Sequence, residues 1–242
     1  SLGEYAGLAA VGEVLSVESL VDVVFYRGMT MQVAVPRDAE GRSDYGMCAV
    51  NPIRVGSTFN ETALKFVVSV IARQSKQLLE IVNFNVENSQ YVVAGELSNL
   101  ETLRLVLNKV KALNLDFKEL VATKTVDEIE EALSGIADEA LEAAASKKLA
   151  RGYIIPERGI ATIPLAGIDV PFHSSFLLSG VTPFREILRK KLDARFINVH
   201  LLVGKYIPNL TAEPFRLDRS YIELVHGLTS SSALAEVLAS WD

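Results

Sequence analysis

The chain has little cysteine and little histidine: its 242 residues include one cysteine, Cys48, and three histidines. A single thiol excludes a disulfide within the chain, and so few thiols and imidazoles exclude a thiolate-rich metal site. We therefore expect no bound metal and a reducing, cytoplasmic location.

Long apolar runs and clustered basic residues are also missing. No apolar stretch approaches the roughly 20 residues that a membrane-spanning helix needs. The formal net charge is −6, and the sequence has no basic stripe with interleaved aromatic residues of the kind that binds a phosphate backbone. We therefore expect neither a membrane nor a nucleic acid as a partner.

Hydrophobic residues, in contrast, are plentiful. They make up 49% of the chain against 22% charged residues, which predicts a globular protein with a well-buried core. Near the start, Ser16 is a suitable N-cap, and the apolar spacing after it predicts a helix to about Val35.

The middle of the chain has a β-α-β-β-α-β pattern. The pattern predicts a strand near Met47, a helix opened by a Thr58–Glu61 capping box, strands at 78–84 and 90–95, a helix opened by a Ser98–Glu101 capping box, and a last strand at 159–165. Residues 117–151, rich in Ala, Glu and Lys, are expected to form a helical insertion with a Thr125–Glu128 capping box. Further on, we expect a helix from Pro183 to about Leu192, a strand at 198–203, and helices at 221–228 and 231–241.

The chain opens with S-L-G-E-Y-A-G-L-A-A. A serine followed by small residues suits a turn between a strand and a helix, where its hydroxyl stands clear and the next backbone N–H groups face an oxyanion. We therefore take Ser1 as a candidate nucleophile and expect a chain truncated at its N-terminus, because such a turn needs a preceding strand. A frayed terminal residue is the alternative that S-x-G alone favours.

A serine hydroxyl needs a base, and histidine suits that role at neutral pH. His173 lies in G-I-D-V-P-F-H-S-S-F, just after the break that Pro171 imposes, where a loop can present an imidazole. His200 fits a sheet face and His226 a terminal helix. His173 is therefore the candidate base, with a structural histidine as the alternative, and Asp169 is the nearest acid but could point elsewhere.

Arg27, in F-Y-R-G-M-T-M-Q, has apolar neighbours, and its guanidinium needs a partner. A surface ion pair is one explanation, and a two-pronged pair with a substrate carboxylate is the other. Gln32 is either a hydrogen-bond partner of this site or a helix-surface residue.

Four segments resemble, in order along the chain, those of the malonyl/acetyl-CoA:acyl-carrier-protein acyltransferases. They are S-L-G-E-Y-A-G-L-A, R-G-x-x-M-Q, N-F-N-V-E-N-S-Q-Y-V-V-A-G and V-P-F-H-S. The longer strings Y-R-G-x-T-M-Q-V-A-V-x-R-D and K-Y-I-P-N-L-T-A-x-P-F are similar to one branch, the malonyl/palmitoyl transferase domain at the C-terminal end of fungal-type fatty acid synthase β subunits. A β subunit that serves a secondary-metabolite pathway would look almost the same.

The resemblance implies the site residues. Ser1 and His173 would form a dyad whose imidazole is oriented by backbone carbonyls, and the backbone N–H of Leu2 would give half of the oxyanion hole. The other half would come from an upstream glutamine that this chain does not contain. Arg27 would hold the malonyl carboxylate.

In the third segment, the resemblance implies that an asparagine lines the pocket. Asn85 is the choice, and Asn88 is the alternative because this chain carries an extra residue there. The hydroxyl, the imidazole and the guanidinium are expected to converge on one acyl pocket.

The resemblance also implies an α/β fold. An α/β-hydrolase-like large subdomain, formed by residues 1–46 and 166–242, would carry an inserted ferredoxin-like small subdomain at 47–165, with the helical insertion at 117–151.

The implied reaction moves malonyl from CoA to the phosphopantetheine thiol of acyl carrier protein through an acyl-serine, and palmitoyl back to CoA. No cofactor would be bound by this segment. Acyl carrier protein, the upstream part of the β subunit and the synthase α subunit would be the partners, the α subunit supplying a C-terminal pocket element absent here. A serine hydrolase or thioesterase and a non-catalytic scaffold are the alternatives.

Overall fold

The computed structural model describes residues 3–10, 15–192 and 198–241. The chain divides into two compact units, residues 31–181 and residues 1–30 with 182–242. We refer to them as the sheet unit and the helical unit and describe each by itself. None of the described helices is long and apolar enough to span a membrane.

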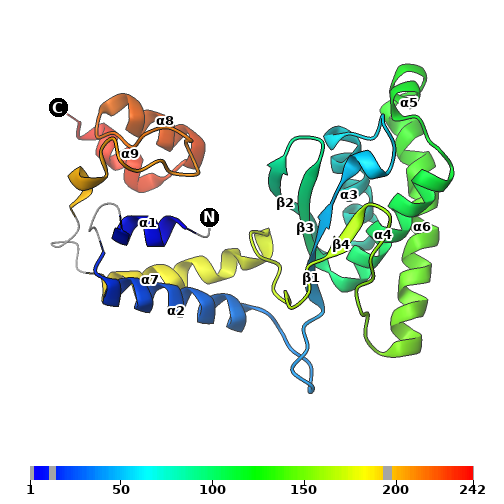
Figure 1. The fold of residues 1–242 in the computed structure, drawn as a ribbon, viewed down its shortest axis with the longest axis horizontal. Helices are drawn as coiled ribbons and strands as arrows, with labels where there is room; N and C mark the ends of the chain where they lie inside the picture. The colour runs from blue at the N-terminus through cyan, green and yellow to red at the C-terminus, as the bar shows by residue number, and fades with distance from the viewer. Residues whose placement is uncertain (1–2, 11–14, 193–197, 242) are drawn as a thin grey trace. The chain divides into compact units, whose positions relative to one another are not determined.

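The sheet unit is built on one four-stranded sheet (Figure 1). Its strands are β1 (Tyr45–Val50), β2 (Leu79–Val86), β3 (Gln90–Glu96) and β4 (Thr162–Pro164), in the order β2-β3-β1-β4, and every neighbouring pair is antiparallel. Helix α3 (Glu61–Ser75) connects β1 to β2, and α4 (Leu97–Ala112) leads from β3 towards β4. The predicted β-α-β-β-α-β order is therefore confirmed.

The two faces of this sheet are covered differently. On one face, alternate strand residues such as Val50, Tyr91 and Val93 pack with buried side chains of α3 and α4 into the main core. On the other face, Met47, Val92 and Ala94 form a smaller cluster, against which Val82, Leu165, Ile168 and Phe172 pack. The second face is thus covered by the segment that leads to His173.

The predicted insertion folds as α5 (Phe117–Thr123) and α6 (Val126–Arg151). The Thr125–Glu128 capping box at the start of α6 is confirmed in both directions. Buried Ala137, Ala140 and Ala144 let α6 approach its neighbours closely, and α3, α4 and α6 gather on one side of the sheet (Figure 1).

Two other predicted capping boxes are wrong. Helix α3 starts at Glu61 with Asn60 as its N-cap, because the Asn60 side chain accepts the N–H of Ala63 at 3.0 Å. Helix α4 starts at Leu97, so Ser98 lies inside the helix, and Glu101 is turned into a buried ion-pair cluster instead of towards the helix start.

The helical unit contains α1 (Glu4–Ala10), most of α2 (Val17–Ala34) and of α7 (Val181–Lys191), α8 (Arg219–Thr229) and α9 (Ser232–Ala239). The predicted helices near 17–35, 183–192, 221–228 and 231–241 are confirmed. The predicted strand at 198–203 is wrong, because Val199–Leu202 forms a 3-10 helix whose N-cap, Asn198, accepts the N–H of His200 at 3.1 Å. No strand occurs among the described residues of this unit.

Candidate active site

A tight turn carries His173. Its backbone has φ +64°, in the left-handed region that residues with a Cβ adopt only where the surroundings enforce it. Val170 and Pro171 are buried before it, and buried Ser174 after it donates its hydroxyl hydrogen bond to the carbonyl of Pro171 at 2.6 Å. His173 itself is exposed. The turn therefore presents the imidazole at the surface of the sheet unit.

The chain on the C-terminal side of this turn is attached to β2. Ser175 donates its backbone N–H to Oε2 of Glu80 at 2.9 Å and its hydroxyl to Oε1 of the same carboxylate. Ser175 also begins the 3-10 helix Ser175–Gly180, in which Phe176 packs on Tyr45 of β1 with ring centroids 4.5 Å apart.

On the N-terminal side, Asp169 pairs with Arg37, whose Nη1 lies 2.5 Å from Oδ2. The hydrogen bond from Arg37 lowers the pKa of Asp169. Arg37 also donates to the carbonyl of Gly41 at 2.9 Å. With the Gln32 amide turned so that its oxygen faces the guanidinium, that oxygen accepts from Nε of Arg37 at 3.1 Å. Asp169 and Gln32 thus both accept hydrogen bonds from Arg37.

Arg27, on α2 in the helical unit, is half-buried. Its Cζ lies 5.9 Å from the ring centroid of Tyr5 on α1, a cation–π contact. Within the described parts of the chain, no carboxylate forms an ion pair with Arg27. Among the described residues, its one charge-related contact is therefore the Tyr5 ring.

Ser1 and Leu2 lie outside the described residues, and the segment is seen from Gly3 onward. Helix α1 is held by the loop that contains K-Y-I-P-N-L-T-A-E-P-F, since Oε1 of Glu4 accepts the N–H of Asn209 at 2.9 Å. A Cβ at Gly7 would lie 3.4 Å from the Tyr206 ring. Small residues after Ser1 therefore allow this loop to approach α1.

The family model of the acyl transferase domain matches residues 1–233. The chain belongs to the acyl transferase domain family. This acyl transferase domain is 52% identical over its full length to fatty acid synthase subunit beta of Schizosaccharomyces pombe and 50% identical to that of Saccharomyces cerevisiae, and it spans 12% of the length of each. FabD from Acinetobacter baumannii, a solved structure, aligns with a TM-score of 0.49 and 19% identity over 93% of this chain and 49% of its own.

The resemblance to acyltransferases of fungal fatty acid synthase β subunits is therefore confirmed. The roles of single residues in this acyl transferase domain stay predictions. His173 and Arg27 belong to different units, so their convergence with Ser1 on one pocket stays a prediction as well.

The two asparagine candidates of the acyl transferase domain differ in their contacts. Asn85 is exposed, at an irregularity in the β2–β3 pairing between Phe84 and Val86. Asn88 has φ +52° in the hairpin turn, and its side-chain oxygen accepts the N–H of Glu61 at 3.0 Å, so it helps to cap α3. This structural role favours Asn85 as the residue available to a ligand.

Sequence reasoning did not single out two polar residues that the fold places near the His173 segment, Arg37 and Asn83. Arg37 lies in the string V-x-R-D, whose similarity to the fungal-type branch could have drawn attention to it. Asn83 is paired with Val92, and cross-strand partners share a sheet face, so Asn83 lies on the face that Phe172 covers. Its signal was the N-x-N spacing with Asn85.

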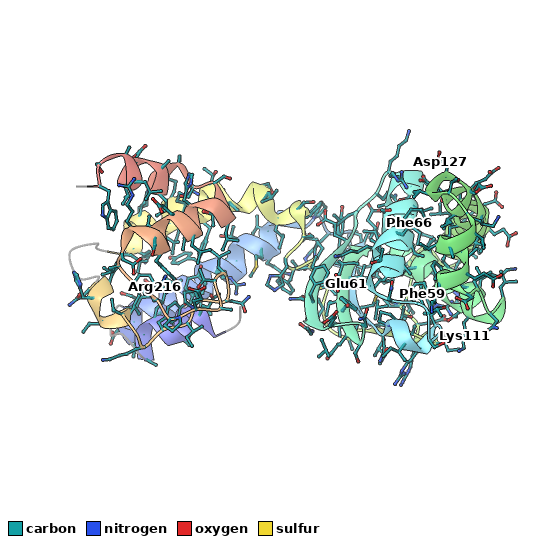
Figure 2. The ribbon with its side chains drawn as sticks, turned by 90° about the horizontal axis from the view of Figure 1, so that it is seen from above. Phe59, Glu61, Phe66, Lys111, Asp127 and Arg216 are labelled. Atoms are coloured by element: carbon teal, nitrogen blue, oxygen red, sulfur yellow. The ribbon has the colours of Figure 1, made fainter. Side chains whose placement is uncertain are left out.

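The acyl transferase domain also has an apolar groove on its helical layer. The groove measures about 680 Å³ and is lined by side chains of α3, α5 and α6, among them Phe66, Phe117 and Val121. Phe66, which lies on α3, can be found in Figure 2. None of the described residues that line this groove was predicted to take part in acyl transfer. Nor do the described residues include a group of three side chains suited to hold a metal.

Proposed function

We propose that this domain transfers malonyl from CoA to the phosphopantetheine thiol of acyl carrier protein, and palmitoyl back to CoA, as part of a fungal-type fatty acid synthase β subunit in the cytoplasm. The observation that carries the proposal is the exposed left-handed turn at His173. The family and the names of the relatives support the same reaction class.

In this reaction, His173 accepts the hydroxyl proton of Ser1 as the serine oxygen attacks the thioester carbonyl. The backbone N–H of Leu2 and a donor from upstream stabilise the oxyanion. The C–S bond then breaks, and the imidazolium protonates the departing CoA thiolate. The carrier-protein thiol attacks the acyl-serine with its proton passing to His173, which returns it to Ser1.

Arg27 is proposed to bind the malonyl carboxylate, because a guanidinium matches a carboxylate with two parallel hydrogen bonds. Its lack of an anionic partner in the described parts of the chain supports this role. Asn85 is proposed to line the pocket. The chemistry uses CoA thioesters as substrates and requires no bound metal or redox cofactor.

For the architecture, we propose that the β-α-β-β-α-β unit is a ferredoxin-like small subdomain. It would be inserted between residues 1–46 and 166–242 of an α/β-hydrolase-like large subdomain that the upstream part of the β subunit completes. A piece of the α subunit would complete the pocket near His173.

Mass spectrometry of the intact protein after incubation with isotopically heavy malonyl-CoA tests the reaction. We expect a malonyl group on Ser1 that acyl carrier protein removes, and no adduct in a Ser1→Ala variant. An unmodified Ser1 would mean a scaffold instead of an enzyme. Rapid release of free malonate without carrier protein would mean a hydrolase.

A further inference from the structure

Both ends of the turn that carries His173 are attached to charged side chains that have no part in the chemistry above. Asp169 precedes the turn and Ser175 follows it, and each makes a charged hydrogen bond to a residue distant in sequence. The turn itself is built on a left-handed histidine, which a chain adopts only where its surroundings hold it.

The attachment on the C-terminal side is a two-point contact with the sheet. Glu80 pairs with Ala94 in the β2–β3 ladder, so its side chain shares the sheet face on which Phe172 packs. Both of its carboxylate oxygens accept from Ser175, one from the backbone N–H and one from the hydroxyl. Two hydrogen bonds from one residue to one carboxylate fix the orientation of the chain as well as its distance from the strand.

The attachment on the N-terminal side is a single charged hydrogen bond, from Arg37 to Asp169. Asp169 is 46% exposed in its side chain, but its partner Arg37 is only 23% exposed and is itself held by Gly41 and Gln32. Since Gly41 and Gln32 fix the guanidinium, Asp169 bonds to a rigid donor and not to a mobile surface arginine.

We propose that Glu80 and Arg37 are positioning residues for acyl transfer: they hold the His173 turn between them and so aim the imidazole at the nucleophile. The inference rests on the proposed function. Proton transfer needs a base within hydrogen-bond distance of the hydroxyl, and small displacements of a catalytic group lower the rate steeply. Neither residue touches the substrate in this scheme.

The test is the rate at which Ser1 of the intact protein is acylated by malonyl-CoA in a single turnover. Ser175→Ala removes the hydroxyl bond and Glu80→Ala removes both bonds. We expect each to lower the limiting acylation rate about tenfold while the half-saturating malonyl-CoA concentration stays unchanged, because positioning affects the chemical step and not binding. Ser175→Thr keeps the hydroxyl and should acylate at the wild-type rate.

The matched control is Glu131→Gln, which changes an exposed carboxylate on α6. It should leave the limiting acylation rate and the half-saturating malonyl-CoA concentration unchanged.

Because Glu80→Ala could impair folding, Asp169→Asn gives a near-isosteric second variant, and thermal melting of each protein checks its folded state. A double Glu80→Ala, Ser175→Ala variant should be no slower than Glu80→Ala alone, since the two changes remove the same contact. Wild-type rates in folded Ser175→Ala and Asp169→Asn would overturn the inference and leave the proposed function standing. Failure of the wild-type protein to acylate Ser1 would instead overturn the proposed function, and the inference with it.

Discussion

Arg27 and Arg37 show how the same side chain is used in two ways. Arg37 meets Asp169, Gly41 and Gln32, so its hydrogen-bonding capacity is largely spent inside the protein. Among the described residues, Arg27 makes a cation–π contact with the Tyr5 ring and no ion pair with a carboxylate. Its N–H groups are therefore left for a ligand. A buried or half-buried guanidinium is costly unless an anion pairs with it, so Arg27 is the better candidate for the proposed binding of the malonyl carboxylate.

Arg27→Ala should therefore weaken malonyl transfer by about 2 to 4 kcal/mol and spare palmitoyl transfer, which involves no carboxylate. The measurement is kcat/KM for the two acyl-CoA substrates with the same preparation. Equal losses for both substrates would contradict a role in carboxylate binding.

The Asp169–Arg37 pair predicts a pH-dependent contribution to stability. The pKa of Asp169 is lowered from its ordinary 3.8 by the hydrogen bond from Arg37, so the pair stabilises the fold above that value. The contribution is lost as the pH falls through the lowered pKa. Since Asp169 is partly exposed, Asp169→Asn should cost about 1 kcal/mol or less at about pH 7 and almost nothing at about pH 2. Urea unfolding at both pH values measures it, and a pH-independent difference would argue against the pair.

Among the elements, the contact of α4 with α6 depends on a buried carboxylate. The Glu101 side chain is 2% exposed, accepts from Nε and Nη2 of Arg104 at 2.8 and 2.7 Å, and accepts from Lys147 at 2.9 Å. Two cations satisfy the carboxylate, and Lys147 also reaches Glu157 at 2.8 Å. The cluster thus fastens the helical insertion to the rest of the sheet unit.

Glu101→Ala should lower the free energy of unfolding by about 3 kcal/mol, because it leaves two poorly solvated cations with Glu157, which is 46% exposed, as their remaining carboxylate partner. Glu139→Gln is the control, since Glu139 is 74% exposed and lies 3.7 Å from Lys109. That change should cost less than about 1 kcal/mol. Chemical denaturation of both variants gives the comparison, and equal losses would mean that the buried cluster contributes no more than a surface pair.

Local patterns predicted most elements but not what satisfies their polar groups. Thr125 and Glu128 formed the capping box that their spacing predicts, since both partners lie within one helical turn. Glu101 was assigned wrongly because its partner Lys147 comes from α6, far along the chain. The strand predicted at 198–203 failed because the Asn198 side chain satisfies a backbone N–H locally, which a hydrophobic pattern does not report.

At the scale of the whole molecule, the arrangement of the strands in the sheet was predictable, because a chain with the order β-α-β-β-α-β has few ways to form one sheet. The contacts around His173 were not. Arg37 and Asp169 are separated by 132 residues, and Glu80 and Ser175 by 95, so only the folded topology brings them together. Sequence motifs identified the candidate base, whereas the residues that hold it became visible only in three dimensions.

The proposed chemistry makes one prediction for the protein as a whole: a chelator such as EDTA should leave the rate of malonyl transfer unchanged. Serine, histidine and backbone donors supply every step, so metal removal takes nothing from the reaction. The assay is transfer to acyl carrier protein before and after chelation, with an activity loss reversed by added metal as the contrary outcome.

Cys48, on the helix-facing side of β1, has a practical consequence. It is 4% exposed, and burial raises the pKa of its thiol to about 12, so little thiolate meets a maleimide reagent. Because this chain has no other cysteine, a cysteine engineered at a chosen surface position would be its one reactive thiol. Fluorophores or spin labels could then report on each unit without first mutating the native residue.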